Sequence, residues 1–207
     1  GQLCRRLLAL VPGLERLRLS SLDPVEIDET LWRLIGEEKR LMPHLHFSVQ
    51  AGDDMILKRM KRRHSRAEAL AACRRARALR PDIALGADMI AGFPTEDDAM
   101  FARSLAFVDE AALDYLHVFP FSARPGTPAS RMPQVPGNIV RERAARLRDA
   151  GAATMSQAFT ARIGTVAQVL VEKAGFGHSE HYAPVRFTGA AEIGSIVRVH
   201  IAEATDK

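Results

Sequence analysis

The sequence contains only two cysteines in 207 residues, Cys4 and Cys73. They lie far apart, so they provide neither a disulfide framework nor a cluster with metal-ligand spacing. Long hydrophobic runs are also missing: no window approaches the roughly 20 apolar residues that a membrane helix needs. The first residues lack the apolar core of a signal peptide. We therefore expect a soluble, cytoplasmic protein whose cysteines are ordinary thiols.

The chain has a formal net charge of only +4, but the charge is unevenly distributed. Residues 58–80 contain ten basic residues and a single acidic one, Glu68, which gives a local charge of +9. Such a block suits a polyanion, because each neutralised phosphate releases condensed counterions. The alternative is that these side chains merely solvate one helix face.

Apolar residues make up 47% of the sequence, enough to bury a core of one ordinary domain plus a smaller one. In residues 1–120, short apolar or alternating segments alternate with amphipathic ones. The segments predict strands at residues 17–20, 44–50, 83–91 and 115–119, and helices from Asp23 to about residue 41, around 56–60, after the Ser65–Glu68 capping box, and after Thr95. This alternation predicts an α/β fold of βαβ units with a parallel sheet, either doubly wound or barrel-like.

Polar and glycine-containing stretches follow the predicted strands. They are Ser20-Ser21, Ser48 with Gln50, Gly92 to Glu96, and Ser122 with Arg124. Because the carboxyl ends of parallel strands carry the site in both arrangements, we expect these stretches to converge on one rim.

The carboxyl-terminal third has a different pattern. Residues 120–137 contain five prolines and two glycines, which resist helix and strand alike and indicate a domain boundary. Asn138 is the expected cap of a long helix, and short β segments with glycine turns follow at 166–172, 183–187 and 195–201. We therefore predict domains at 1–135 and 164–207, joined by a linker helix at 136–163.

Four motifs then occur in a fixed order. They are Arg16-Leu-Arg-Leu-Ser-Ser-Leu-Asp-Pro24, the stretch from His44 to Arg62 that contains Ser-Val-Gln-Ala-Gly-Asp-Asp and Lys-Arg-Met-Lys-Arg, Asp88-Met-Ile-Ala-Gly-Phe-Pro-Thr-Glu96, and His117-Val-Phe-Pro-Phe-Ser-Ala-Arg-Pro-Gly-Thr-Pro-Ala129. Together they resemble the radical S-adenosylmethionine tRNA methylthiotransferases, most strongly the members that act on threonylcarbamoyladenosine. The resemblance covers essentially the whole chain.

Members of this family have three parts: a domain with an auxiliary iron-sulfur cluster, a six-stranded partial (β/α) barrel with a C-x-x-x-C-x-x-C loop, and a small RNA-binding β-barrel, the TRAM domain. The resemblance implies that this chain holds about four of the six barrel strands, the third to the sixth, followed by the TRAM-like barrel. It begins after both cysteine-rich regions, so it resembles a fragment. Because iron-sulfur clusters need thiolates, we expect the cluster ligands outside this chain and no catalysis by the chain alone.

The resemblance also implies a function. The family adds a methylthio group to C2 of a modified adenosine beside the anticodon, here N6-threonylcarbamoyladenosine, by radical S-adenosylmethionine chemistry. The expected partners are S-adenosylmethionine and a tRNA anticodon stem-loop. The implied cofactor-binding residues are Ser21, Ser48, Gln50, Arg62, Asp88, Gly92, Phe93, Pro94, Glu96 and Phe119, and no catalytic residue is identified.

Candidate RNA-binding residues are Arg59, Arg63, Arg124, Arg186 and Arg198. The segment from Gly164 to Lys207 has a net charge of −1, so RNA contact there would depend on a local patch, with Phe176 or Tyr182 to stack on a base. We expect no metal site, because the spacing of His44, His46 and His64 lacks the remaining ligands of a closed site.

Two other functions are compatible with parts of the pattern. A cluster-free RNA-binding module would use the basic block and the β-barrel. An ordinary metabolic barrel enzyme would need a phosphate-binding glycine loop or a suitably placed lysine, and neither is found. Because a partial barrel exposes an unpaired edge and an apolar inner face, we also predict self-association.

Overall fold

The computed structural model describes residues 1–205. Its larger part is a parallel sheet of β1 (His44–Gln50), β2 (Ala84–Ala91) and β3 (Tyr115–Pro120), in that order. Helix α4 (Arg66–Leu79) connects β1 to β2, and α5 (Asp98–Glu110) connects β2 to β3. This is the βαβ alternation that the sequence predicts, so the α/β class with a parallel sheet is confirmed.

The predicted strand at residues 17–20 is wrong as a regular strand. The segment instead lies beside β1 with two isolated parallel bridges, Leu17 to Leu41 and Leu22 to Phe47. Leu22 donates its N–H to the His46 carbonyl and accepts the N–H of Ser48, both at 2.8 Å. The described residues therefore contain three parallel strands in this sheet, with a fourth segment following the same direction.

The helix predicted from Asp23 divides into two pieces. Asp23 caps only a 3₁₀ turn, η1 (Pro24–Glu26), and Asp28 caps α2 (Glu29–Glu37) by accepting the Leu31 N–H at 2.7 Å. Two aspartates at N-cap positions compete in this short stretch, and the later one begins the longer helix. Helix α1 (Gln2–Leu10) is not among the helices predicted from the sequence.

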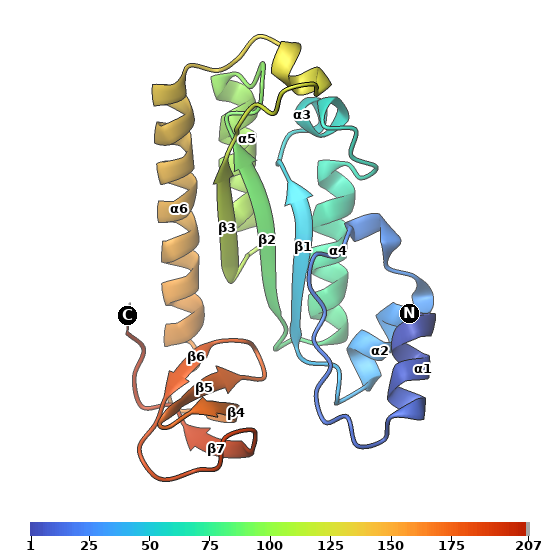
Figure 1. Cartoon of the computed structure of the whole chain (residues 1–207), viewed down its shortest axis with the longest axis vertical. Helices are drawn as coiled ribbons and strands as arrows, with labels where there is room; N and C mark the ends of the chain where they lie inside the picture. The colour runs from blue at the N-terminus through green and yellow to red at the C-terminus, as the bar shows by residue number, and fades with distance from the viewer. Residues whose placement is uncertain (206–207) are drawn as a thin grey trace.

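One face of the parallel sheet packs against helices. One buried core contains residues of α2, α4, α5 and α6. It also contains the sheet residues Leu45, Phe47, Leu85 and Met89, whose side chains point toward these helices. Helix α6 (Gly137–Thr160) runs alongside β3, as Figure 1 shows. It begins one residue before the predicted cap, Asn138, and its first turn has no side-chain cap. The opposite, inner face of the sheet carries no helix of the described residues (Figure 1).

A second, smaller sheet follows α6. It has the antiparallel order β6-β5-β4-β7, formed by β4 (Val166–Lys173), β5 (Phe176–Ser179), β6 (Pro184–Arg186) and β7 (Ile196–His200). Its own small core contains Ala167, Val169 and Val185. The sheet lies beyond the amino-terminal ends of β1 to β3 (Figure 1). The domain boundaries and the TRAM-like barrel closure stay predictions.

The remaining elements are short. Helix α3 (Asp54–Arg59) follows β1, where a helix around residues 56–60 is predicted, and η2 (Pro128–Arg131) interrupts the proline-rich segment. The predicted Ser65–Glu68 capping box of α4 is confirmed, with both reciprocal hydrogen bonds present.

Candidate functional site

The inner face of the parallel sheet is polar. Side chains alternate along each strand, and the positions that do not join the helix-side core carry histidines, an aspartate and aromatic rings. From β1 to β3 the inner-face residues are His44, His46, Ser48, Gly86, Asp88, Ile90, Tyr115, His117 and Phe119. A wall of polar side chains on a parallel sheet is unusual, because such sheets commonly have apolar side chains on both faces.

Three of these inner-face side chains meet at one point. His46 Nε2 lies 2.9 Å from Asp88 Oδ1, and His117 Nδ1 lies 3.2 Å from the same oxygen. The two imidazole rings are tilted against each other with centroids 4.5 Å apart. Burial lowers the pKa of His46, although the Asp88 carboxylate opposes this effect. Asp88 is thus hydrogen-bonded on the inner face, as expected for an aspartate in an apolar strand.

Below this cluster a hollow of about 1790 Å³ separates the two sheets. Its lining includes Arg18, Ser21, His44 and the three residues of the cluster on one side, and Arg186 and Arg198 on the other. The Arg18 guanidinium lies 3.6 Å from the centre of the Tyr182 ring. Burial, helped by the charge of Arg18, lowers the pKa of His44 to about 4.

The carboxyl ends of the strands form a separate edge, on the far side from the small sheet (Figure 1). Gln50 at the end of β1 has a φ of 72°, and Gly92 just beyond β2 has a φ of 74°. A Cβ at Gly92 would lie 2.6 Å from Val140 of α6, so only glycine fits both the conformation and the close approach. Phe119, near the end of β3, is 50% exposed.

The loop after β2 is held by a buried ion pair. Glu96 Oε1 accepts the Gly92 N–H at 3.0 Å and lies 2.9 Å from Arg143 NH1 of α6. Burial raises the pKa of Glu96 despite the arginine. Phe93 and Pro94 are buried, and the Phe93 ring packs edge-on against Phe121 at 5.2 Å. Phe93, Pro94 and Glu96 therefore shape the loop, and the backbone carbonyl of each accepts a hydrogen bond from within the chain.

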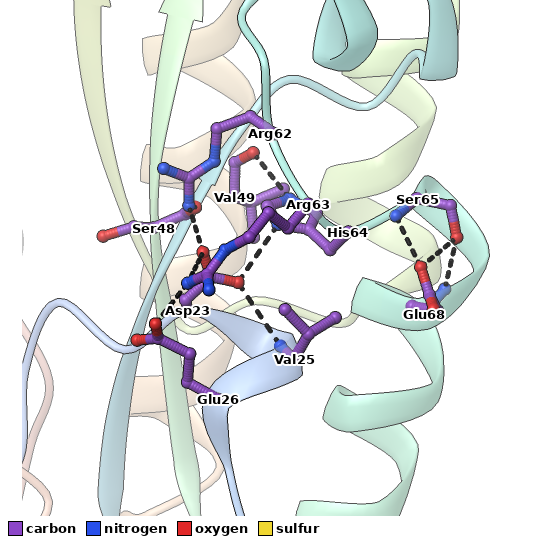
Figure 2. A network of polar contacts seen from close by, with 10 residues as sticks. All are labelled: Asp23, Val25, Glu26, Ser48, Val49, Arg62, Arg63, His64, Ser65 and Glu68. Atoms are coloured by element: carbon purple, nitrogen blue, oxygen red, sulfur yellow. Dashed lines mark hydrogen bonds and ion pairs between the residues drawn. The ribbon is translucent and has the colours of Figure 1, made fainter.

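Arg62 takes part in a network centred on Asp23 (Figure 2). Its NH2 group donates to Asp23 Oδ2 at 3.1 Å and to the Ser48 carbonyl at 2.7 Å. His64 contacts the same segment: its Nε2–H donates to the Val49 carbonyl at 3.1 Å, and its Nδ1 is 3.4 Å from Asp23 Oδ1. These contacts fasten the segment before η1 to the end of β1. Arg62 thus has intramolecular partners where a cofactor carboxylate is expected.

Most of the basic block is engaged in the same way. Arg63 pairs with Glu26, Arg66 with Glu110 at 2.7 Å, and Arg75 with Glu29 at 2.6 Å. Three more arginines of the block donate hydrogen bonds to backbone carbonyls of the chain: Arg59 to Thr95, Arg77 to Ala111 and Arg80 to Leu41. The contacts favour the structural alternative for the block, and they involve both Arg59 and Arg63 of the predicted RNA-binding set.

The structure brings the other predicted site residues into two groups. Ser48, Gln50 and Phe119 lie at the carboxyl-end edge, whereas Ser21 and Asp88 line the hollow. Arg124, Arg186 and Arg198 are exposed, the first in the loop after β3 and the others on β6 and β7. Three of the predicted strand tips, at Gln50, Gly92 and Phe119, therefore lie at one edge of the sheet, and Ser21 lines the hollow.

Comparison with known proteins gives the family. The family model described as the Radical SAM superfamily matches residues 4–108, half of the chain. The chain belongs to the radical SAM superfamily. Among the described residues no helix is both long and apolar enough to cross a membrane.

Curated relatives of this radical SAM chain modify tRNA. It is 50% identical over 201 residues to the threonylcarbamoyladenosine tRNA methylthiotransferase MtaB of Rickettsia prowazekii, covering 97% of this chain and 48% of that protein. It is 41% identical over 206 residues to the tRNA-2-methylthio-N(6)-dimethylallyladenosine synthase of Novosphingobium aromaticivorans, covering 96% of this chain and 46% of that protein. The predicted resemblance to tRNA methylthiotransferases is confirmed, and the chain spans about half the length of these relatives.

Among solved structures, coproporphyrinogen III oxidase (HemN) from Escherichia coli, a radical SAM enzyme, matches with a TM-score of 0.55. The match covers 78% of this chain and 38% of that chain at 21% sequence identity. It shows a shared fold and supports the assignment of the parallel sheet as part of a radical SAM barrel.

The residues present differ in how well they fit the two cofactors of the superfamily. Cys73 on α4 is part of the helix-side core, Cys4 on α1 packs against that core, and burial raises the pKa of Cys73 to about 11. These thiols do not fit an iron-sulfur cluster, which needs several thiolates at one place. S-adenosylmethionine fits better, because Ser48 and Gln50 offer hydrogen-bonding groups and Phe119 an exposed ring at one edge.

Proposed function

We propose that this chain is part of a tRNA methylthiotransferase and forms a portion of its S-adenosylmethionine site. The observation that carries the proposal is the carboxyl-end edge of the parallel sheet, where Ser48 and Gln50 end β1, Phe119 lies near the end of β3, and Gly92 follows β2 in the left-handed conformation. In parallel α/β folds ligands bind at this edge. Bound S-adenosylmethionine would supply the methyl group and the radical precursor.

Each residue at this edge has a separable task in the proposal. Ser48 and Gln50 hydrogen-bond the ribose hydroxyls and the methionine end of the cofactor. The half-exposed ring of Phe119 would stack against the adenine, and the missing side chain of Gly92 lets Val140 of α6 pack against the loop that borders this edge. Arg143 and Glu96 position the Gly92 loop through their buried ion pair, without touching the ligand.

The proposed substrate is N6-threonylcarbamoyladenosine next to the anticodon, modified at C2 with a methylthio group. The higher identity to the relative that acts on threonylcarbamoyladenosine than to the dimethylallyladenosine enzyme supports this choice. The small antiparallel sheet acts as the RNA-binding TRAM-like part, with Arg186 and Arg198 as phosphate contacts and Phe176 as a stacking ring. The iron-sulfur clusters are ligated outside these 207 residues.

A cluster-free RNA-binding module is the other candidate, and the contacts of the basic block disfavour it. Arg62, Arg63, Arg66 and Arg75 all have internal acidic partners. A surface that binds RNA through the block would have to exchange these partners for phosphates.

Two binding measurements on the chain test the proposal. Equilibrium dialysis with labelled S-adenosylmethionine should show binding that Gln50→Ala weakens. Gln168→Ala, an exposed glutamine on β4 of the other sheet, should leave it unchanged. Filter binding measures the affinity of the chain for an anticodon stem-loop over a salt series. This affinity should fall as the salt concentration rises, since phosphate contacts release counterions.

The outcomes separate the two candidates. Cofactor binding that depends on Gln50 supports the methylthiotransferase proposal. Steep salt-dependent RNA binding with no cofactor binding by any form of the chain would favour the RNA-binding module.

A further inference from the structure

Three potential metal ligands from three different strands converge on the inner face of the parallel sheet. They are His46 Nε2 of β1, Asp88 Oδ1 of β2 and His117 Nδ1 of β3, and all three atoms lie within 4.8 Å of one another. Asp88 and His117 are direct register partners across β2 and β3, and His46 pairs with Gly86, one inner-face position before Asp88. The hydrogen-bonded register of the three strands therefore sets the positions of the three Cα atoms relative to one another.

Two of the three donor separations are close to those around a single coordinated ion. Donor atoms around a tetrahedral zinc with bonds of about 2.05 Å lie about 3.3 Å apart. The His46–Asp88 and Asp88–His117 separations are 2.9 and 3.2 Å. A small movement of the exposed His117 ring and of the Asp88 carboxylate away from the enclosed His46 ring would thus replace two hydrogen bonds with two bonds to a metal. Two imidazole nitrogens and one carboxylate oxygen form a donor set that suits zinc and divalent iron.

The cluster combines a rigid side with an open side. His46 is 6% exposed, and its ring lies over Gly86, where a Cβ would be 2.3 Å from Nδ1. The ring can occupy this position only because residue 86 has no side chain. His117, in contrast, has a side chain that is 63% exposed toward the hollow. A metal held here would keep a coordination position open to the hollow, as catalytic zinc sites do.

The hollow supplies a plausible chemistry for that open position. Arg18, Arg186 and Arg198 line it as well as the cluster, together with the acidic Glu180 and Glu203, so its walls carry charges of both signs. A water molecule, or an oxygen of a carboxylate or phosphate, is the class of ligand that a divalent ion would take at this place. Asp88 provides the negative charge that offsets the repulsion between the ion and Arg18.

We propose that His46, Asp88 and His117 bind one divalent first-row transition-metal ion, with Zn²⁺ as the representative, and present it to the hollow. The proposal does not depend on the methylthiotransferase assignment, because it uses only side chains of the inner face below the strand ends. It replaces the sequence-based expectation of no metal site. The other histidines named in that expectation take no part: His64 contacts the Val49 carbonyl instead, and His44 lies beside Tyr115 and Tyr182.

Titration of the metal-free chain with Co²⁺, followed by visible absorption and reversed with Zn²⁺, tests the site. We expect one ion per chain, with ligand-field bands and no thiolate charge-transfer band, since neither cysteine lies at the site. Asp88→Asn and His117→Ala should each weaken binding at least about tenfold. His117→Ala removes a mostly exposed side chain, so circular dichroism should show an unchanged fold.

His178→Ala is the matched control. His178 also pairs with a carboxylate, Glu172 at 2.8 Å, and also lines the hollow, but it has no second imidazole at that carboxylate. The control should bind Co²⁺ like the wild type. The proposal is overturned if the wild type binds no stoichiometric ion, if His178→Ala weakens binding as much as His117→Ala, or if Asp88→Asn and His117→Ala bind with wild-type affinity.

Discussion

Arg143 of α6 donates to the Oε1 atom of Glu96 at 2.9 Å, although 46 residues separate the two in the sequence. Both side chains are nearly inaccessible, with exposed fractions of 5% and 0%. Because Glu96 also accepts the Gly92 N–H, the long helix α6 and the loop at the end of β2 are held through one carboxylate. The loop at the proposed cofactor edge therefore depends on a residue of a helix beyond the predicted domain boundary.

Removal of the arginine should destabilise the chain. Arg143→Met leaves the Glu96 carboxylate buried without its counter-ion, a change that typically costs about 3–5 kcal/mol. Urea unfolding at pH 7 measures the loss. In a Glu96→Gln background the same substitution should cost clearly less, because no buried charge remains. Equal losses in both backgrounds would show that packing of the arginine stem, and not the ion pair, stabilises this contact.

The stability of the chain should fall at mildly acidic pH because of His44. Its pKa is lowered from 6.5 to about 4, mainly by burial. The folded state favours the neutral ring, so this contribution is complete above pH 6.5 and is lost as the pH falls toward 4. The shift corresponds to at most about 3 kcal/mol. His44→Phe, which keeps a ring beside Tyr115, should show a flatter profile between pH 7 and pH 4 in denaturant titrations. If the free energy of unfolding of His44→Phe changes with pH as it does in the wild type, His44 is not the cause of the pH dependence.

The Arg143–Glu96 ion pair also shows which contacts cannot be predicted from the sequence. The strands at 44–50, 83–91 and 115–119 and the α4 capping box are predictable because periodicity and capping are local signals. The pairing of Arg143 with Glu96 is not, because no local pattern says which of many arginines reaches a buried carboxylate. The same holds for the His46–Asp88–His117 cluster. A search for titratable residues at inner-face positions of consecutive parallel strands could have found it.

The resemblance predicted the family correctly, and its site residues stay predictions. Phe93 and Pro94 belong to one of the motifs that carry the resemblance, and both are buried, Phe93 against Phe121. Arg62 is used by Asp23 and the Ser48 carbonyl. Motif order reports which loop lies at the edge, whereas burial decides which atoms of the loop remain available to a ligand.

Gly86 should tolerate no side chain. A Cβ there would lie 2.3 Å from His46 Nδ1, and the ring is enclosed. Gly86→Ala should therefore destabilise the chain by about 1–3 kcal/mol, the usual cost of overpacking, and should weaken Co²⁺ binding by displacing the His46 ring. Adding His46→Ala should recover part of the stability in thermal melts. If the double variant is as unstable as the sum of both single variants, the ring is not what excludes a side chain at residue 86.

Self-association stays a prediction and has a specific surface to test. Phe119 is 50% exposed on the inner face, which no helix of the described residues covers. Burial of such a ring against a second chain is favourable. Light scattering should show a mass that rises with concentration, and Phe119→Ser should reduce the rise. A strictly monomeric, folded species at high concentration would refute the prediction.

The most direct test of the whole account is mass spectrometry of nucleosides from the tRNA of cells that lack the gene encoding this chain. The account predicts loss of 2-methylthio-N6-threonylcarbamoyladenosine, accumulation of N6-threonylcarbamoyladenosine, and restoration by the intact gene but not by one carrying Gln50→Ala. Unchanged levels of the methylthiolated nucleoside in the deletion strain, with no second gene supplying the activity, would contradict it.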